Sequence, residues 1–152
     1  MKNLLLIFLF LGIFISSQTY HAKVVGVHDG DTVYVLDSLN VNHKIRIAGI
    51  DAPESNQDFG TQAKKFVSDQ IFKKIVTIKV NTHDLYGREV SWLYYENKNL
   101  SEELLKNGFA WHYAKYDHQK YLQDLEDEAR KNKIGLWSLP NPVPPSEFRK
   151  QK

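Results

Sequence analysis

The stretch "VHDGDTVYVLDSLNVNHKIRIAGI", residues 27–50, alternates apolar and polar side chains on either side of two turns. In "TVYVL" Val33 and Val35 share one face, and in "HKIRIAGI" Ile45 and Ile47 share one face while Arg46 points to the other. This alternation is typical of half-buried β-strands, and an Asp-Gly pair is a frequent hairpin turn. The stretch therefore predicts three consecutive strands, with an arginine on the face opposite to the isoleucines.

Downstream, the period of the apolar residues separates helices from further strands. A helical period over residues 59–71 predicts an amphipathic helix, and alternation returns over residues 74–80 and 90–95. Ser101, followed by two glutamates, predicts the start of a second helix that stops at Gly108. A third helix is expected near residues 117–131, and its predicted buried stripe is Tyr121, Leu122, Leu125 and Ala129.

Five short strands with a helix between the third and the fourth are the arrangement of an OB-fold barrel, a common carrier of oligonucleotide sites. The expected fold class is therefore β+α: a five-stranded OB-fold barrel with three α-helices, preceded by a signal peptide. At 152 residues the chain is the size of one domain. We expect the signal peptide over residues 1–19, the barrel domain over 20–139, and a proline-rich, extended or disordered tail over 140–152.

The N-terminal residues have the layout of a secretory signal peptide. Lys2 is followed by an apolar run over residues 4–15 and then by small and polar residues. This run is shorter than the roughly 20 residues of a membrane-spanning helix. We expect a secreted or extracytoplasmic protein, cleaved between residues 16 and 21, with an uncleaved membrane anchor as the alternative.

Composition excludes some kinds of site. The chain has no cysteine, so thiolate metal sites and thiol catalysis are excluded. Six histidines lack the paired spacing of a zinc site, and we expect them at the surface or in loops. The net charge of +2 indicates no strongly basic nucleic-acid-binding domain, so any such function must depend on where individual charges lie.

Four segments carry polar residues that the fold does not require: "DGDT" (29–32), "IRIAGIDAPE" (45–54), "DLYGR" (84–88) and "FAWHYAKY" (109–116). Each segment alone is compatible with an ordinary turn or loop. Together they contain hard carboxylate ligands and arginine forks, a combination that suits a divalent cation and an anionic, phosphate-bearing substrate. Pro53 biases Ala52 toward an extended conformation, so that the Ala52 carbonyl could serve as a further metal ligand.

The motifs in this order resemble the thermonuclease family, the staphylococcal nuclease-like phosphodiesterases. The resemblance extends from "VVGVHDGDTVYV" through "IRIAGIDAPE", "FGTQAKKF" and "DLYGR" to "GFAW" and "IGLW". It implies an OB barrel with three helices and a calcium-dependent, secreted or membrane-associated nuclease. Some members of the family have lost their catalytic residues and act only as binding modules.

Carried over by position, the resemblance implies a role for each matching residue. The implied calcium ligands are Asp31, Asp51 and the carbonyl of Ala52. Glu54 would orient or deprotonate the attacking water, and Arg46 and Arg88 would hold the scissile phosphate. The implied nucleotide-site tyrosines are Tyr86 and Tyr116, with Tyr113 as the alternative to Tyr116. The loop after Glu54, "SNQDFG", is shorter than in the best-known member.

The hypothesis from the sequence is a monomeric, exported, Ca²⁺-dependent nuclease. Its expected substrate is DNA in the first place and RNA in the second, and its expected products end in a 3'-phosphate and a 5'-hydroxyl. The alternative is a non-catalytic OB-fold module that binds nucleic acid. A missing carboxylate or arginine would favour that module, and none of the five is missing.

Overall fold

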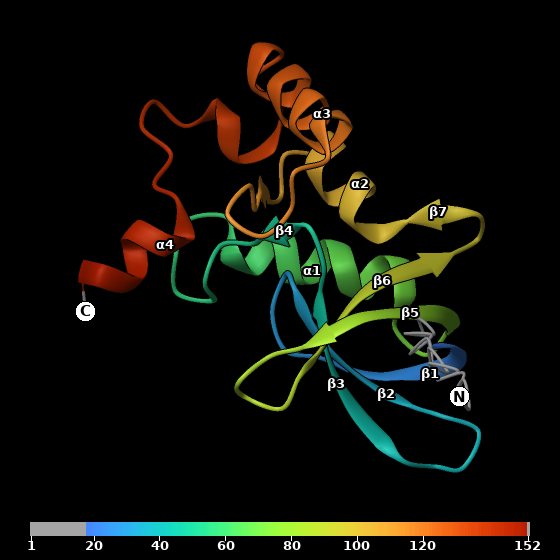
Figure 1. Ribbon diagram of the computed structural model, residues 1–152. Helices are drawn as coiled ribbons and strands as arrows, with labels where there is room; N and C mark the ends of the chain where they lie inside the picture. Colours follow the sequence, from blue (N-terminus) through green and yellow to red (C-terminus); the bar gives the residue numbers. More distant parts are fainter. Residues whose placement is uncertain (1–17, 152) are drawn as a thin grey trace, which may run out of the picture.

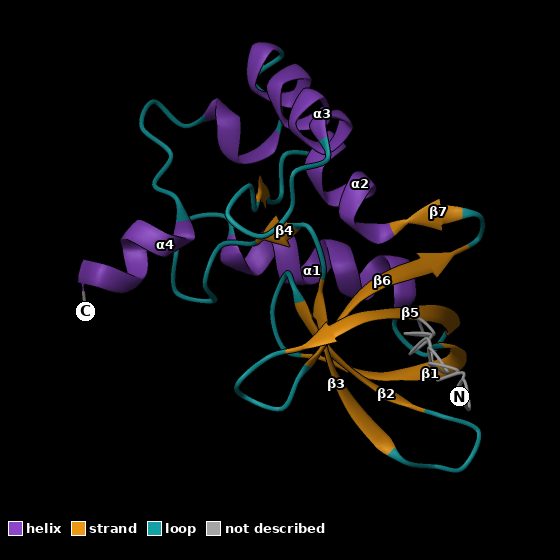
Figure 2. Cartoon of the chain, viewed as in Figure 1, coloured by secondary structure: helices purple, strands orange, loops and turns teal. Residues whose placement is uncertain are grey.

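The computed structural model describes residues 18–151, and a barrel of five strands makes up its lower part in the view of Figures 1 and 2. The strands are β1 (Thr19–Val27), β2 (Thr32–Leu36), β3 (Asn42–Ile47), β5 (Ile75–His83) and β6 (Glu89–Tyr95). They pair in the order β3-β2-β1-β5-β6, and parallel pairing of β3 with β6 closes the barrel. The predicted five-stranded OB-fold barrel is confirmed.

Three helices of seven or more residues accompany the barrel in the described chain: α1 (Gly60–Ile71), α2 (Leu100–Lys106) and α3 (Lys120–Lys131). Helix α1 contacts β1 and α2, and α3 packs on α2 (Figure 1). Two short pairings supplement the barrel. Strand β7 (Lys98–Asn99) pairs antiparallel with the end of β6, and β4 (Ile50–Asp51) pairs antiparallel with β8 (Trp111–His112).

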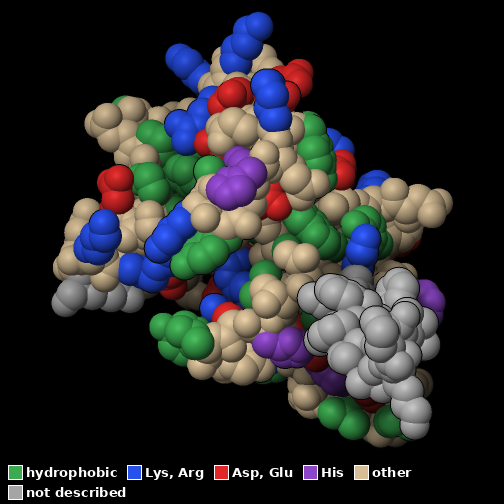
Figure 3. Space-filling model, in the orientation of Figure 1, with side chains coloured by type: hydrophobic (Ala, Val, Ile, Leu, Met, Phe, Trp, Pro, Cys, Tyr) green, Lys and Arg blue, Asp and Glu red, His purple; other side chains and the backbone are tan. Residues whose placement is uncertain are grey.

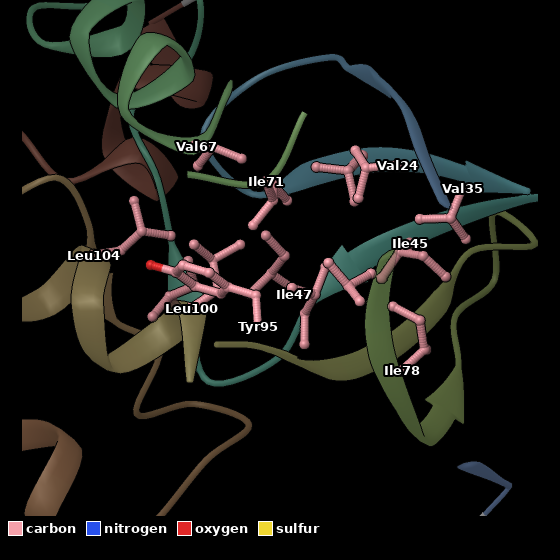
Figure 4. Close-up of a cluster of buried hydrophobic side chains, with 14 of the residues drawn as sticks. Val24, Val35, Ile45, Ile47, Val67, Ile71, Ile78, Tyr95, Leu100 and Leu104 are labelled. Atoms are coloured by element: carbon pink, nitrogen blue, oxygen red, sulfur yellow. The ribbon is translucent and has the colours of Figure 1, made fainter. Parts of the chain in front are cut away.

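The core lies inside the barrel and under α1 and α2. The faces predicted from alternation are buried, since Val33, Val35 and Ile45 are fully inaccessible. Figure 4 shows strand residues of this core in one cluster with Val67 and Ile71 of α1. Burial of an aliphatic side chain contributes about 1.5–3 kcal/mol, so this cluster is the main source of the fold's stability.

The start of α2 differs from the prediction. The residue that caps the helix is Asn99, whose side chain accepts a hydrogen bond from the Ser101 amide at 2.9 Å. The Ser101 hydroxyl, predicted as the cap, instead donates to the Ala48 carbonyl at 2.8 Å and is fully buried. The predicted end is confirmed, because Gly108, which follows the C-cap residue Asn107, has a φ of 63°.

The buried face of α3 also differs from the predicted stripe. Tyr121 is 44% exposed, whereas Glu126 is buried. Glu126 accepts hydrogen bonds from the backbone amide of His112 and from the Arg130 side chain at 2.7 Å. A carboxylate can occupy this position because both of its oxygens have donors.

The C-terminal residues agree only in part with the expected extended or disordered tail: Pro144 is extended, with a φ of −61° and a ψ of 142°, but the residues that follow it are helical. Helix α4 (Pro145–Phe148) and the 3₁₀ turn η2 (Arg149–Gln151) follow the 3₁₀ helix η1 (Gly135–Ser138). Pro145 occupies the first turn of α4, where a missing N–H costs nothing and the fixed φ favours a helix. Figure 1 shows α4 beside the loop between β4 and α1.

The expected signal peptide lies almost entirely outside the described residues, which begin at 18. Within residues 18–151, no helix has the length and apolar character needed to cross a membrane.

Candidate active site

A cleft of about 790 Å³ opens at one end of the barrel. Its walls come from β3, the loop after β4, the β5–β6 hairpin, the loop after β8, and η2. In Figure 3, Lys and Arg side chains lie close to Asp and Glu side chains in the hollow between the barrel and the helical part. All eight residues named from the sequence line this cleft: Asp31, Arg46, Asp51, Ala52, Glu54, Tyr86, Arg88 and Tyr116.

Arg46 lies at the floor of the cleft and is held in place from several directions. It projects from β3, and only 11% of its side chain is exposed. Its Nη1 donates to the Ile47 carbonyl at 2.9 Å, and its Nη2 lies 3.1 Å from Asp51 Oδ1 and 3.3 Å from Asp31 Oδ2. A guanidinium fixed in this way presents its charge to the cleft in one orientation.

Asp31 joins the first turn of the barrel to the loop after β4. Its Oδ2 accepts a hydrogen bond from the Ala52 amide at 2.8 Å, and its backbone carbonyl accepts one from the Ile47 amide at 2.8 Å. The neighbouring Gly30 permits this close approach, since a Cβ there would lie 2.7 Å from the Ala52 Cβ. The glycine of "DGD" therefore has a packing role besides its role in the turn.

Asp51 is placed by β4, where its backbone pairs with Trp111 of β8. Burial raises the pKa of Asp51 above its usual value; a hydrogen bond from Arg149 and the charge of Arg46 offset this in part, and the charge of Asp31 adds to it. Burial and the negative charge of Asp31 also raise the pKa of Asp29. The cost of burying these two carboxylates is thus only partly offset by the groups around them.

Glu54 stands at the edge of the cleft, with 30% of its side chain exposed. Its backbone forms a tight turn, because the Gln57 amide donates to the Glu54 carbonyl at 2.8 Å. Gly60, the first residue of α1, is required beside it, since a Cβ there would lie 1.9 Å from the Glu54 carbonyl oxygen. A single ion pair holds the Glu54 carboxylate, with Arg149 Nη1 at 2.8 Å from Oε1.

The hairpin between β5 and β6 orients Arg88. Asp84 accepts hydrogen bonds from the Arg88 amide at 3.0 Å and from Arg88 Nε at 2.6 Å. Burial raises the pKa of Asp84, but these bonds outweigh burial and hold the pKa below its usual value. The ring of Tyr86, 85% exposed, lies 5.7 Å from the Arg88 guanidinium. The segment "DLYGR" is thus both a hairpin turn and a lining segment of the cleft.

The loop after β8 supplies two tyrosines to the opposite wall. The Tyr113 ring lies 6.0 Å from the Arg46 guanidinium and packs edge-on against Tyr116, with 4.9 Å between ring centres. Tyr116 is 70% exposed. Both tyrosines therefore line the cleft, Tyr113 against the arginine and Tyr116 toward solvent.

Two histidines expected at the surface or in loops belong to internal networks. The side chain of His112 is 4% exposed and lies between Asp117 and Gln123, at 3.2 and 3.0 Å. These contacts secure the loop that carries the two tyrosines. His43 bridges Asp37 and Glu89 at 3.0 and 2.6 Å, and Glu89 also accepts a hydrogen bond from the Tyr20 hydroxyl. Glu89 directly follows Arg88, so this network secures the end of the hairpin.

Two further residues of the site were not singled out from the sequence. Asp84 could have been found from its spacing, because an aspartate four residues before an arginine in a turn can pair with it. Arg149 carries no such signal: it belongs to the C-terminal segment, 98 residues from Asp51 in the chain. Its guanidinium forms ion pairs with Asp51 at 2.9 Å and with Glu54 at 2.8 Å.

The side chains of the cleft do not by themselves complete a site for a hard divalent cation. Backbone carbonyls and water must supply the remaining ligands. Within residues 18–151, no three His, Cys, Asp or Glu side chains already form a metal-ligand cluster. Calcium and magnesium also accept backbone carbonyl and water ligands, so two carboxylates with a carbonyl are sufficient. The guanidinium seated on Asp51 and Glu54 marks a position that attracts positive charge.

The chain is similar to several nucleases. It is 38% identical over 152 residues to an "uncharacterized endonuclease" of Haemophilus influenzae, covering all of this chain and 85% of the relative. It is 34% identical over 144 residues to a "micrococcal nuclease" of Shigella flexneri, covering 86% and 81%. A "staphylococcal-like nuclease" of Arabidopsis thaliana is 41% identical over 109 residues, but this match covers only 34% of the plant protein.

The family described as "Staphylococcal nuclease homologue" matches residues 44–139. The match includes Arg46, Asp51, Glu54 and Arg88, and it ends before the C-terminal segment that carries Arg149. The OB-fold barrel, the lining of its cleft and this match agree: the chain belongs to the staphylococcal nuclease family.

Proposed function

We propose that this nuclease hydrolyses phosphodiester bonds of DNA, and of RNA as a second substrate, with Ca²⁺ as its metal ion. One observation carries the proposal: carboxylates and arginines from three separate segments meet in one cleft, with the Arg46 guanidinium fixed between Asp31 and Asp51. This arrangement suits a substrate with a concentrated negative charge. Membership of a nuclease family supports the same reaction.

Asp31, Asp51 and the Ala52 carbonyl are the proposed metal ligands. They lie together because the Ala52 amide donates to Asp31 and because Asp51 precedes Ala52. All three donors are hard oxygens, which favours Ca²⁺ or Mg²⁺ over softer transition metals. A metal ion held by these ligands would supply positive charge that stabilises the phosphate oxygens.

Glu54, Arg46 and Arg88 are the proposed catalytic residues. Glu54 is partly exposed at the edge of the cleft, where its carboxylate can accept a proton from an attacking water. Negative charge accumulates on the equatorial phosphate oxygens as the bond breaks, and Arg46 and Arg88 present fixed guanidinium groups in the same cleft. The water oxygen forms a bond to phosphorus as the bond from phosphorus to the 5' oxygen breaks; one proton of the water passes to Glu54, and the leaving 5' oxygen takes a proton from solvent to become the 5'-hydroxyl.

The exposed tyrosines favour a substrate that carries nucleobases. Tyr86 and Tyr116 stand at the rim on different segments, and both present large ring faces to solvent. Aromatic faces stack on the bases of single-stranded nucleic acid with little dependence on sequence. We therefore propose that Tyr86 and Tyr116 hold the nucleotides beside the scissile phosphate. The Tyr113 ring, packed edge-on against Tyr116, holds that residue in position.

The test is cleavage of labelled single-stranded DNA, duplex DNA and RNA by the purified domain, with Ca²⁺, with Mg²⁺ and with a chelator. We expect cleavage that requires Ca²⁺ and leaves 3'-phosphate and 5'-hydroxyl ends, which phosphatase and kinase treatment of the products identifies. Binding without cleavage under all conditions would assign the chain to the non-catalytic modules. Cleavage that persists in the chelator would remove the metal from the proposal.

We further propose that the protein is exported as a monomer after removal of an N-terminal signal. The support is the layout of Lys2, the apolar run and the polar residues that follow it. The described strand β1 already includes Thr19, which pairs with Lys79 of β5. Cleavage should therefore fall at or before residue 18, and N-terminal sequencing of protein from the culture medium and from membranes distinguishes release from anchoring.

A further inference from the structure

The C-terminal segment places a positive charge on the carboxylates that the proposed function assigns to the metal and to the water. Arg149 Nη2 lies 2.9 Å from Asp51 Oδ2, and Nη1 lies 3.4 Å from Asp51 Oδ1 and 2.8 Å from Glu54 Oε1. One guanidinium therefore bridges a candidate metal ligand and the candidate base. The Asp51 side chain is 5% exposed, so it has little access to solvent cations while Arg149 is in place.

The rest of the segment is anchored on the loop that carries Glu54. Gln57 Nε2 donates to the Val143 carbonyl at 2.6 Å, and Pro145 is buried. A second hollow lies between this segment and the loop, lined by residues of both, including Asn56 and Phe148. Figure 1 shows α4 against this loop. The position of Arg149 is thus part of a docked structure.

The docked arginine and a divalent cation compete for the same oxygens. A metal ion held by Asp51 would lie next to the guanidinium on Asp51 Oδ2, and two cations in that position repel each other. Arg149 Nη1 also occupies Glu54 Oε1, one of the two carboxylate oxygens that an attacking water could approach. Metal binding and docking of Arg149 therefore oppose each other. Docking of Arg149 lowers the affinity for the metal, and bound metal lowers the equilibrium constant for docking by the same factor.

We propose that residues 140–151 form an autoinhibitory arm, in which Arg149 occupies the cation site at Asp51 and Glu54 and leaves it when a divalent metal binds. This inference rests on the proposed function, because it takes Asp51 as a metal ligand. The arm keeps the cleft closed to its metal at low metal concentration. It also neutralises Asp51 and Glu54 in the metal-free protein.

The first experiment is titration of the full domain with Ca²⁺ alone, without nucleic acid, followed by calorimetry. Arg149→Gln removes the competing charge, and Lys150→Gln removes the neighbouring exposed charge as a matched control. We expect Arg149→Gln to bind Ca²⁺ roughly three- to tenfold more tightly than the wild type, the competition expected from two partly exposed ion pairs. Lys150→Gln should bind like the wild type.

The second experiment uses the unmodified chain, so that it does not depend on the folding of a variant. Amide hydrogen exchange of residues 145–151 is measured with and without saturating Ca²⁺. The amides of Glu147 and Phe148 donate to the Pro144 carbonyl within α4, and a helix of only four residues does not persist once it is undocked, so exchange there should become faster in Ca²⁺, while exchange of α3 stays unchanged.

The outcomes separate this inference from the proposed function. Equal Ca²⁺ affinity of the wild type and Arg149→Gln, or exchange of the arm that is unchanged or slower in Ca²⁺, would overturn the autoinhibitory arm and leave the metal site intact. Failure of both proteins to bind Ca²⁺ would overturn the metal site and the arm together. Tighter binding by the variant with faster exchange in the wild type would support both.

Discussion

Arg46 and Asp51, five residues apart, are joined by a contact of 3.1 Å between Nη2 and Oδ1 within a network that also includes Asp31. The proposed phosphate-binding arginine is therefore positioned by the proposed metal ligands. A change at any of the three groups disturbs the other two, because the contacts share buried, charged atoms. In the proposed function, these carboxylates would therefore set where the substrate's phosphate lies.

Replacement of Arg46 by lysine keeps the charge but loses the planar fork. A single ammonium cannot reach the Ile47 carbonyl and Asp51 together and also face a phosphate, so we expect the cleavage rate to fall by about 10³ or more. Single-turnover cleavage measures the loss, and circular dichroism checks the fold. Lys44→Arg on the same strand is the control. Near-normal cleavage by Arg46→Lys would rule out the assigned role.

Glu54→Gln removes the candidate base with almost no change in shape. We expect the cleavage rate to fall by roughly 10² to 10⁴, the usual contribution of a general base. The fold should be unaffected, since Glu54 is partly exposed and makes one ion pair. Glu147→Gln in α4 is the matched control. If Glu54→Gln cleaves at the rate of Glu147→Gln, the base is another group.

Tyr86→Ala should weaken substrate binding more than it slows the chemistry. Loss of one stacked base costs about 1–3 kcal/mol, so KM for a single-stranded oligonucleotide should rise about 5- to 150-fold with little change in kcat. Tyr86→Phe should retain the wild-type KM, because the ring remains. Leu85→Ala, at a neighbouring side chain that is fully exposed, is the control. A loss confined to kcat would contradict a stacking role.

The network around His43 predicts how stability depends on pH. Burial lowers the pKa of His43, but hydrogen bonds to Asp37 and Glu89 outweigh burial and raise the pKa above its usual value near 6.5. The pKa of Asp37 is lowered by the same contact. The stabilisation is therefore fully present between the usual pKa values of the two groups. It is lost as pH rises through the folded pKa of His43 or falls through that of Asp37.

Urea denaturation of the wild type and of His43→Gln over a range of pH measures this dependence. The difference in midpoint should be largest at mildly acidic pH and should shrink as pH rises above the folded pKa of His43. His118→Gln, at an exposed position, is the control and should run parallel to the wild type. A difference between the wild type and His43→Gln that does not change with pH would show that the histidine acts by packing alone.

Replacement by alanine should lower the free energy of unfolding by different amounts at two glycines that have a positive φ. Gly87 has a φ of 75° and open space around it, so Gly87→Ala should cost only the backbone strain, about 1–2 kcal/mol. Gly108 has a φ of 63°, and a Cβ there would lie 2.1 Å from the Ile134 carbonyl oxygen. Gly108→Ala should therefore lose clearly more free energy of unfolding than Gly87→Ala. Equal losses would mean that the contact with Ile134 relaxes freely.

The parts of the fold and site that depend on local pattern could be predicted from the sequence. Alternation placed Arg46 on the face opposite to Ile45, and the structure has Ile45 in the core and Arg46 in the cleft. The eight named site residues lie in short motifs whose internal spacing is set by a strand or a turn. Their meeting in one cleft follows from the barrel, which the same alternation predicts.

The parts that depend on distant partners could not be predicted. Glu126 is polar in a stripe that periodicity marks as apolar, and its burial makes sense only once the His112 amide is known to face it. The path of the C-terminal segment depends on the docking of Val143 on Gln57, 86 residues away. Prolines indicate where regular structure is interrupted, but they do not indicate where the following residues return to the protein.

Closure of the barrel by β3 and β6 has a consequence for the way the protein acquires its activity. Strand β3 carries Arg46, and strand β6 follows Arg88. Within the described chain these two strands meet only through their parallel pairing, which joins Arg46 to Val90, 44 residues apart. Contacts of such long range form late in folding, because the chain must first lose the entropy of a large loop. A chain with its hairpins formed but its barrel still open has its two arginines on separate elements. Recovery of cleavage activity during refolding would therefore report closure of the barrel by β3 and β6. A partly folded chain with an open barrel would be inactive.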